Sequence, residues 1–238
     1  LLLGAVIALT LNASCVHVKV GRYENYHPGS HAAMVLGDAI DLRIFPSHWR
    51  NAFMVERDDR KSLQVFDAAG DAVHKIHLRE TSNHGAWARI RAELALADQS
   101  EHLALDPRQP VEAAKTNPEK VDLLRSKWAR MTDTHQFLRL TSKLKMNRLG
   151  AYRSVGEPYA LRVPEDSVDR ALQAAAAREV GVMIFVGNRG CIQIHSGPIR
   201  QLRAMGPWQN EKDPDFNQHL RLDKIAEVWV ADKPTQRG

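Results

Sequence analysis

The sequence predicts an α+β fold in which two similar antiparallel sheet units, each with attached helices, follow one another as a tandem repeat. Two observations predict this fold. The pattern N-x-x-C-[VI]-x-[VI]-x-x-G occurs at residues 12–21 and again at residues 188–197. A second pair of matching segments, residues 41–44 and 219–222, follows in the same order at nearly the same offset. Two matches in order indicate an internal duplication.

The repeated segments have the residue alternation of β-strands. β-branched residues occupy every second position: Val16, Val18 and Val20 in the first copy, Ile192 and Ile194 in the second. Residues 1–11 form another apolar strand pattern, and residues 62–67 and 72–78 flank a short turn, which predicts an antiparallel hairpin. The second copy of this hairpin would begin where the sequence stops, and the sequence starts without Met. We therefore expect a chain that is truncated at both ends.

Helical patterns lie between the predicted strands, at residues 85–96, 121–155 and 167–179. A polar segment with three prolines, residues 106–120, is typical of a linker. The predicted organisation is therefore a first repeat at residues 1–105, a linker at 106–120 and a second repeat at 121–238.

Composition excludes several classes of protein. The chain has 238 residues, of which 44% are hydrophobic, so it can bury a sizeable core. No window approaches the roughly 18 apolar residues of a membrane span, so we expect no membrane insertion. Cys15 and Cys191 are too few for a disulfide framework or a zinc site of the cysteine-pair type, which is compatible with a cytoplasmic location. Cys191 and His195 lie too far apart along one strand to form a nucleophile–base pair, and we predict that both cysteines are buried and inert.

The positive charge of the chain is concentrated in one stretch, residues 125–153. This stretch carries eight basic residues and one acid, whereas the net charge of the whole chain is only +5. The stretch lacks interleaved exposed aromatic residues and any known nucleic-acid-binding module, so we expect no nucleic-acid partner.

His135 is the histidine in this stretch. It falls at helical spacing on one predicted helix face with three apolar residues and a serine: Trp128, Met131, Leu138 and Ser142. With Thr132 or Asp133 as the N-cap, His135 would lie two or three residues into a helix, where positive charge is disfavoured. A neutral imidazole on an apolar face among cations suits haem, which presents an iron, a flat macrocycle and two propionates. A packed or solvated helix histidine is the alternative.

Several longer segments resemble the HemS/ChuS family of bacterial haemin-handling proteins. The matching segments of the second half are FVGNRGCIQIHSGP at 185–198, MGPW at 205–208, FNQHLR at 216–221, IAEVWV at 225–230 and KPT at 233–235. Those of the first half are IDLRIF at 40–45 with Trp49, SLQVFD at 62–67 and GDAVHK at 70–75. The resemblance covers nearly the whole chain, in order, and implies the same tandem repeat of sheets.

The resemblance also implies a set of haem-binding residues. The axial histidine of the family lies in a segment similar to residues 131–137, which makes His135 the iron ligand. The D-L-R segment assigns Arg43 to the opposite haem face, where it would be the candidate catalytic residue. Arg148 and Lys233 correspond to residues that contact the propionates. Each has an alternative role: Arg43 could pair with Asp41, and Arg148 and Lys233 could be solvated charges.

Two functions follow from the resemblance, and the sequence leaves both open. The first is a cytoplasmic haem-binding protein of haem uptake and iron acquisition, which receives imported haem b and delivers it for degradation. Its implied protein partners are a recipient haem oxygenase and the inner-membrane haem importer. The second is an enzyme that itself opens the porphyrin, using O₂ or peroxide with an electron donor.

Overall fold

The computed structural model describes residues 2–100 and 102–236, which form two compact units. Unit 1 combines residues 2–100 and 102–109 with 169–224, and unit 2 combines residues 110–168 with 225–236. The units therefore do not coincide with the two sequence repeats, because most of the second repeat packs with the first. The repeat boundaries at 106 and 121 stay a prediction about the organisation of the sequence.

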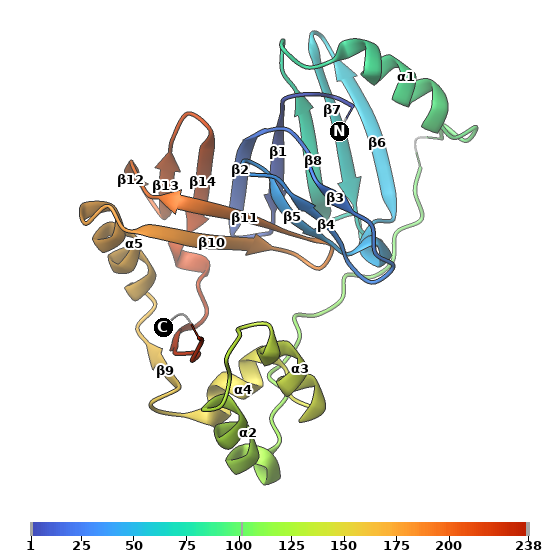
Figure 1. The fold of residues 1–238 in the computed structure, drawn as a ribbon. Helices are drawn as coiled ribbons and strands as arrows, with labels where there is room; N and C mark the ends of the chain where they lie inside the picture. The colour runs from blue at the N-terminus through green and yellow to red at the C-terminus, as the bar shows by residue number, and fades with distance from the viewer. Residues whose placement is uncertain (1, 101, 237–238) are drawn as a thin grey trace. The chain divides into compact units, whose positions relative to one another are not determined.

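Unit 1 contains two antiparallel sheets (Figure 1). The strands from the first repeat are β1 (Val6–Leu11), β2 (Cys15–Gly21), β3 (Tyr26–His27), β4 (Ala33–Leu36), β5 (Asp41–Ile44), β6 (Asn51–Arg57), β7 (Arg60–Phe66) and β8 (Ala72–Leu78). Those from the second are β10 (Gly181–Gly187), β11 (Cys191–Pro198), β12 (Leu202–Met205), β13 (Trp208–Lys212) and β14 (Phe216–Arg221). One sheet has eight strands in the order β12-β13-β14-β2-β1-β8-β7-β6, and the other has five in the order β10-β11-β5-β4-β3. The predicted α+β fold with large antiparallel sheets is confirmed, as is the β7–β8 hairpin.

The two repeats exchange strands. In the eight-stranded sheet β14 of the second repeat pairs with β2 of the first, and in the five-stranded sheet β11 of the second pairs with β5 of the first. Each sheet therefore contains strands from both copies, which is why unit 1 cannot be divided at the repeat boundary. Strand β1 begins at Val6, later than the predicted strand; residue 1 lies outside the described residues.

Matching turns join the two copies. In the first, Oδ1 of Asn12 accepts hydrogen bonds from the backbone N of Ser14 and Cys15, at 2.8 and 2.9 Å. In the second, Oδ1 of Asn188 accepts from the backbone N of Gly190 and Cys191, both at 2.9 Å. Both are the local turns that asparagine side chains favour.

The amide group of each asparagine donates a hydrogen bond to the other copy of the repeat. Nδ2 of Asn12 donates to the carbonyl of Gly187 at 3.0 Å, and Nδ2 of Asn188 donates to the carbonyl of Leu11 at 2.8 Å. The predicted duplication is therefore visible as two equivalent turns that bind each other.

Unit 1 also contains α1 (His84–Leu94), η1 (Pro46–His48) and η3 (Leu222–Lys224), and α5 (Ser167–Ala177) leads from unit 2 into it. The side chain of Asn83 caps α1 by accepting from the backbone N of Ala86. Trp87 on this helix is 1% exposed, which fixes the buried face of α1. No helix among the described residues has the length and apolar character needed to span a membrane.

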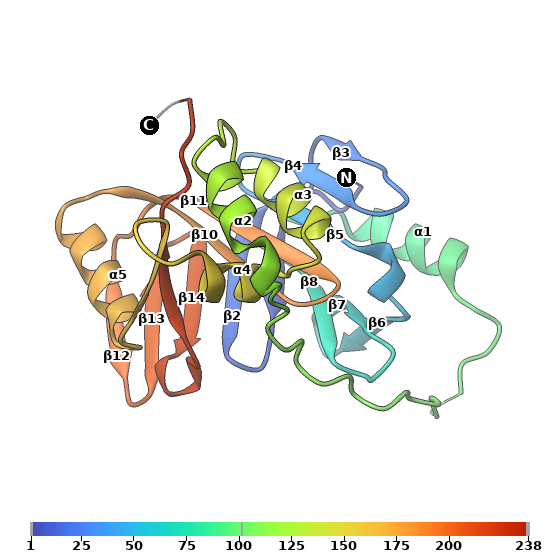
Figure 2. The same cartoon turned by 90° about the horizontal axis from the view of Figure 1, so that it is seen from below.

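Unit 2 is built around three short helices, seen together in Figure 2. They are α2 (Val121–Trp128), α3 (Gln136–Lys143) and α4 (Arg148–Val155). The short helix η2 (Pro118–Lys120) precedes them. Unit 2 also contains the antiparallel strand pair β9 (Ala160–Val163) and β15 (Val228–Ala231). The core of the helices is aromatic: Trp128 meets Phe137 edge-on at 5.0 Å between ring centroids. The helical pattern predicted across residues 121–155 is thus broken twice. The second break contains Lys145, whose φ of 58° ends a helix.

Candidate functional site

The segment before α3 holds His135 at the surface of unit 2. The sequence predicted His135 inside the helix, but α3 begins at Gln136 and His135 is its N-cap residue. The physical reason is the carboxylate of Asp133. Its Oδ1 accepts the backbone N–H of His135 at 2.7 Å, and this turn delays the start of the helix.

The same carboxylate oxygen also binds the His135 ring. Oδ1 of Asp133 lies 2.7 Å from Nδ1 of His135, and the His135 side chain is 89% exposed. Nε2 of His135 has no hydrogen-bond partner within residues 2–100 and 102–236. The exposed Nε2 atom is therefore free to coordinate a metal.

The C-terminal residues of unit 2 pack against this segment. The backbone N of Gln236 donates to the carbonyl of Thr132 at 3.1 Å. Nζ of Lys233 lies 4.5 Å from the ring centroid of Phe137 and donates to Oη of Tyr152 at 3.0 Å. The predicted residue Lys233 is thus held near the start of α3, by a cation–π contact and a hydrogen bond.

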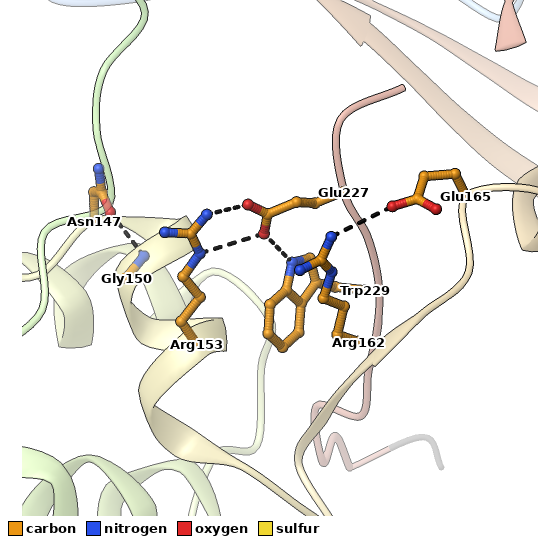
Figure 3. A network of polar contacts seen from close by, with 7 residues as sticks. All are labelled: Asn147, Gly150, Arg153, Arg162, Glu165, Glu227 and Trp229. Atoms are coloured by element: carbon orange, nitrogen blue, oxygen red, sulfur yellow. Dashed lines mark hydrogen bonds and ion pairs between the residues drawn. The ribbon is translucent and has the colours of Figure 1, made fainter. Parts of the chain in front are cut away.

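Arg148 is the first residue of α4 and is exposed. It makes no ion pair with any residue that the structure describes. Asn147 precedes it and caps the helix, accepting the backbone N–H of Gly150 at 2.9 Å (Figure 3). Arg148 is therefore a free cation on a fixed helix end, in the same unit as His135 and Lys233.

Arg43 lies in β5 of unit 1 and forms an ion pair with Asp41, which is the alternative role predicted from the sequence. Its Nη1 also donates to the carbonyl of Leu42 at 3.1 Å. A guanidinium carries five N–H donors, so Nε and Nη2 keep donors for a ligand.

The basic stretch does not act as one patch. Arg125 donates to the carbonyls of Val155 and Glu157, and its guanidinium lies 5.3 Å from the ring centroid of Tyr159. Arg153 pairs with Glu227 (Figure 3). Both arginines therefore hold unit 2 together.

Four other cations of the stretch line an open groove of about 660 Å³ beside α2 and α3: Lys127, Arg130, Arg139 and Lys143. Leu123 and Leu140 are among the apolar residues of the same groove. Arg148 and Lys145 are not among the residues that line this groove.

The predicted burial of both cysteines is confirmed. Cys15 is 6% exposed and Cys191 is fully buried, and burial raises the pKa of each thiol to about 12. Cys191 contacts Oγ1 of Thr10 at 3.5 Å, and Thr10 in turn contacts Nδ1 of His74 at 2.8 Å. A buried thiol with a raised pKa is a poor nucleophile.

Sequence reasoning missed a polar cluster in the interior of unit 1. Lys19 and His195 meet there, with Nζ 3.2 Å from Nδ1, and the His195 ring stacks on Phe216 at 3.8 Å. His17 is fully buried, and neither of its ring nitrogens has a partner among the described residues. The signal was available in the repeat, because Lys19 and His195 occupy equivalent positions, 176 residues apart.

Burial sets the protonation of this cluster. It lowers the pKa of His17 to about 3 and that of His195 to about 4. Glu211 also lies in the cluster, and burial raises its pKa to about 7. The histidines are therefore neutral at pH 7, while Glu211 lies close to its own midpoint.

The comparison with protein families identifies the chain. The model of the haemin-degrading HemS/ChuX domain matches residues 2–94 and 145–238. The chain belongs to this family. One matched segment lies in each repeat, and together they include three of the four predicted site residues, Arg43, Arg148 and Lys233. His135 lies between them.

Relatives of the HemS/ChuX family agree with this assignment. The chain is 37% identical over 240 residues to the hemin transport protein HmuS of Yersinia pestis, covering 99% of this chain and 69% of the relative. Apo-PhuS, a heme-binding protein from Pseudomonas aeruginosa, has a TM-score of 0.89 and 38% identity, with 99% of this chain and 70% of that chain covered. ChuS, an E. coli heme oxygenase, has a TM-score of 0.84 and 32% identity, with 99% and 71% covered.

Proposed function

We propose that this chain binds haem in bacterial haem uptake and iron acquisition, with His135 as the axial iron ligand, and delivers it for degradation. The observation that carries the proposal is the exposed His135 ring, whose Nδ1 is bound by Asp133 and whose Nε2 is free. The names of the relatives support it, since HmuS is a hemin transport protein and PhuS a heme-binding protein. We propose a cytoplasmic location, with a haem oxygenase as recipient and the inner-membrane importer as donor. No nucleic-acid partner is part of the proposal.

The residues around His135 suit haem as a ligand. Haem needs a nitrogen donor for its iron, an apolar surface for its macrocycle and cations for its propionates. His135 supplies the nitrogen. Leu138, three residues further along the chain, is 57% exposed and offers apolar surface next to it. Arg148 and Lys233 are the cations that we assign to the propionates.

Arg43 is the residue that we assign to the opposite face of the haem. Its remaining N–H donors can hydrogen-bond a ligand or water at the iron while Nη1 stays bound to Asp41. An arginine fixed in this way would supply a donor of constant charge at that face.

Oxidative haem degradation is the second candidate. The observation that favours it is the 32% identity to ChuS, which is described as a heme oxygenase, together with the family description as haemin-degrading. Bound haem would supply an iron that activates O₂ next to the macrocycle. In this case Arg43 would act as a catalytic residue by donating a hydrogen bond to the iron-bound ligand.

Haem titration of the whole chain tests the proposed function. His135→Ala should shift the Soret band and weaken haem binding, because the axial ligand is lost. His84→Ala is the matched control: His84 also stands at the start of a helix, α1, and should leave the spectrum and affinity unchanged. A His135→Ala protein with the wild-type spectrum and affinity would overturn the assignment.

Aerobic reduction of the haem complex then separates the two candidates. Persistence of the haem spectrum supports delivery of intact haem. Conversion to an open tetrapyrrole that catalase does not suppress supports the enzyme, and Arg43→Ala should then slow that conversion.

A further inference from the structure

We infer that Asp133 is a positioning residue for His135: it selects the tautomer that leaves Nε2 unprotonated and aims the ring outward. The inference rests on the proposed function, because it concerns how His135 is prepared to coordinate iron. Asp133 binds the residue at two points through one oxygen, at 2.7 Å to the backbone N and at 2.7 Å to Nδ1.

The hydrogen bond to the ring decides the tautomer. A carboxylate can only accept hydrogen bonds, so Nδ1 of His135 must carry the proton that is shared with Asp133. In a neutral imidazole the lone pair is then on Nε2, the atom that points away from Asp133. Histidine ligands of metals commonly donate their other N–H to a carboxylate in this way, which fixes the ring and makes it a stronger donor.

The backbone contact restricts the direction of the side chain. Because the same oxygen holds the backbone N and Nδ1, rotation of the ring about the Cα–Cβ bond would break the second hydrogen bond. A separate pair of contacts holds the turn. Oε1 of Gln136 accepts the backbone N–H of Thr132, and Nε2 of Gln136 donates to Oγ1 of Thr132, both at 3.1 Å. Gln136 thus supports the turn without bonding to the imidazole.

Because Asp133 bonds to the imidazole and Gln136 does not, variants of these two residues form a matched pair. Asp133→Asn keeps an oxygen that can accept the backbone N–H of His135, but its amide N–H₂ can donate to Nδ1 and so favour the wrong tautomer. The same exchange beside a catalytic histidine is known to have this effect. Gln136→Ala loosens the same turn and leaves the bond between Asp133 and Nδ1 in place.

The first measurement uses the free protein and needs no haem. Long-range ¹H–¹⁵N correlation spectra report which ring nitrogen of His135 is protonated. We expect the Nδ1–H tautomer in the wild-type protein and in Gln136→Ala, and a shift towards Nε2–H in Asp133→Asn. Equal tautomer populations in wild type and Asp133→Asn would overturn the inference, whether or not the chain binds haem.

The second measurement uses the haem complex. Asp133→Asn should weaken haem binding about ten- to hundredfold, the usual effect of removing such a partner. It should also move the reduction potential of the iron to a more positive value and lower the iron–histidine stretching frequency, because the ring becomes a weaker donor. Gln136→Ala should change neither the potential nor the stretching frequency.

These measurements distinguish a wrong iron ligand from a wrong role for Asp133. If His135→Ala leaves the haem spectrum unchanged, the assignment of His135 as the axial ligand is wrong. The tautomer measurement on the free protein still decides the role of Asp133. If His135→Ala abolishes the axial spectrum but Asp133→Asn matches wild type in potential and stretching frequency, the ligand stands and the positioning role is wrong.

Discussion

Lys19 and His195 occupy the same position in the two repeats, and their side chains meet inside unit 1, with Nζ 3.2 Å from Nδ1. Such a contact between equivalent residues is expected where an approximate two-fold axis passes between the two copies. The crossed hydrogen bonds of Asn12 and Asn188 obey the same relation. The two copies of the repeat therefore associate as the subunits of a symmetric dimer do, within one chain.

Acid should destabilise unit 1 through its buried histidines. Burial lowers the pKa of both His17 and His74 from 6.5 to about 3, so each is neutral in the fold and takes up a proton on unfolding below pH 6.5. The free energy of unfolding should fall by about 1.4 kcal/mol per pH unit for each histidine between about pH 6 and pH 4. Urea unfolding at several pH values measures this slope.

His17→Gln is the matched variant for this slope, because Gln193 occupies the equivalent position in the second repeat. It should remove the contribution of one histidine. Glu211 acts with the opposite sign: burial raises its pKa from 4.5 to about 7, so it gains a proton in the folded state first and offsets part of the loss as the pH falls. Glu211→Gln should therefore make the slope steeper; a shallower slope would contradict the assignment of this residue.

Removing the side chain of Asn188 should loosen the junction between the repeats. Its amide donates to the carbonyls of Leu11 and Val73, both at 2.8 Å, and its oxygen accepts two backbone N–H groups. Asn188→Ala should lower the free energy of unfolding by about 2–6 kcal/mol, since four hydrogen bonds are lost and each costs roughly 0.5–1.5 kcal/mol. The more exposed Asn12→Ala should cost less, and urea denaturation of the two variants compares them. Equal losses of unfolding free energy in the two variants would contradict the expectation that the more exposed turn contributes less to stability.

Arg148 should contribute to haem affinity by its charge alone. A charge-assisted hydrogen bond to a shielded propionate contributes about 1.5–3 kcal/mol, so Arg148→Ala should weaken haem binding about ten- to hundredfold. The Soret band should keep its position, because His135 is untouched. Titration at low and high salt tests the shielding, since exposed ion pairs weaken strongly with salt.

Lys143→Ala is the control for Arg148, because Lys143 lines the groove beside α2 and α3. It should have a smaller effect on haem binding. If both variants bind haem like wild type but bind DNA or RNA less tightly, the basic residues serve a nucleic-acid partner instead.

Much of this protein follows from local patterns in its sequence. The alternation at Val16 and Val18 predicts a strand, and the repeated motif predicts equivalent strands with buried cysteines. These features depend on residues that lie close together in the chain, and periodicity reports such residues directly. The candidate ligand His135 was found in the same way, from spacing and resemblance.

Tertiary structure decided the features that depend on distant residues. The pairing of β14 with β2 joins residues about two hundred positions apart, and no local pattern specifies which strand is the neighbour. Burial of Lys19 and His195 was not predicted, although the two residues are equivalent in the repeat, because a polar residue on a strand is assigned to the solvent side unless its partner is known. The start of α3 at Gln136 was likewise set by the hydrogen bond that the backbone N–H of His135 donates to Asp133, which helix propensities do not predict.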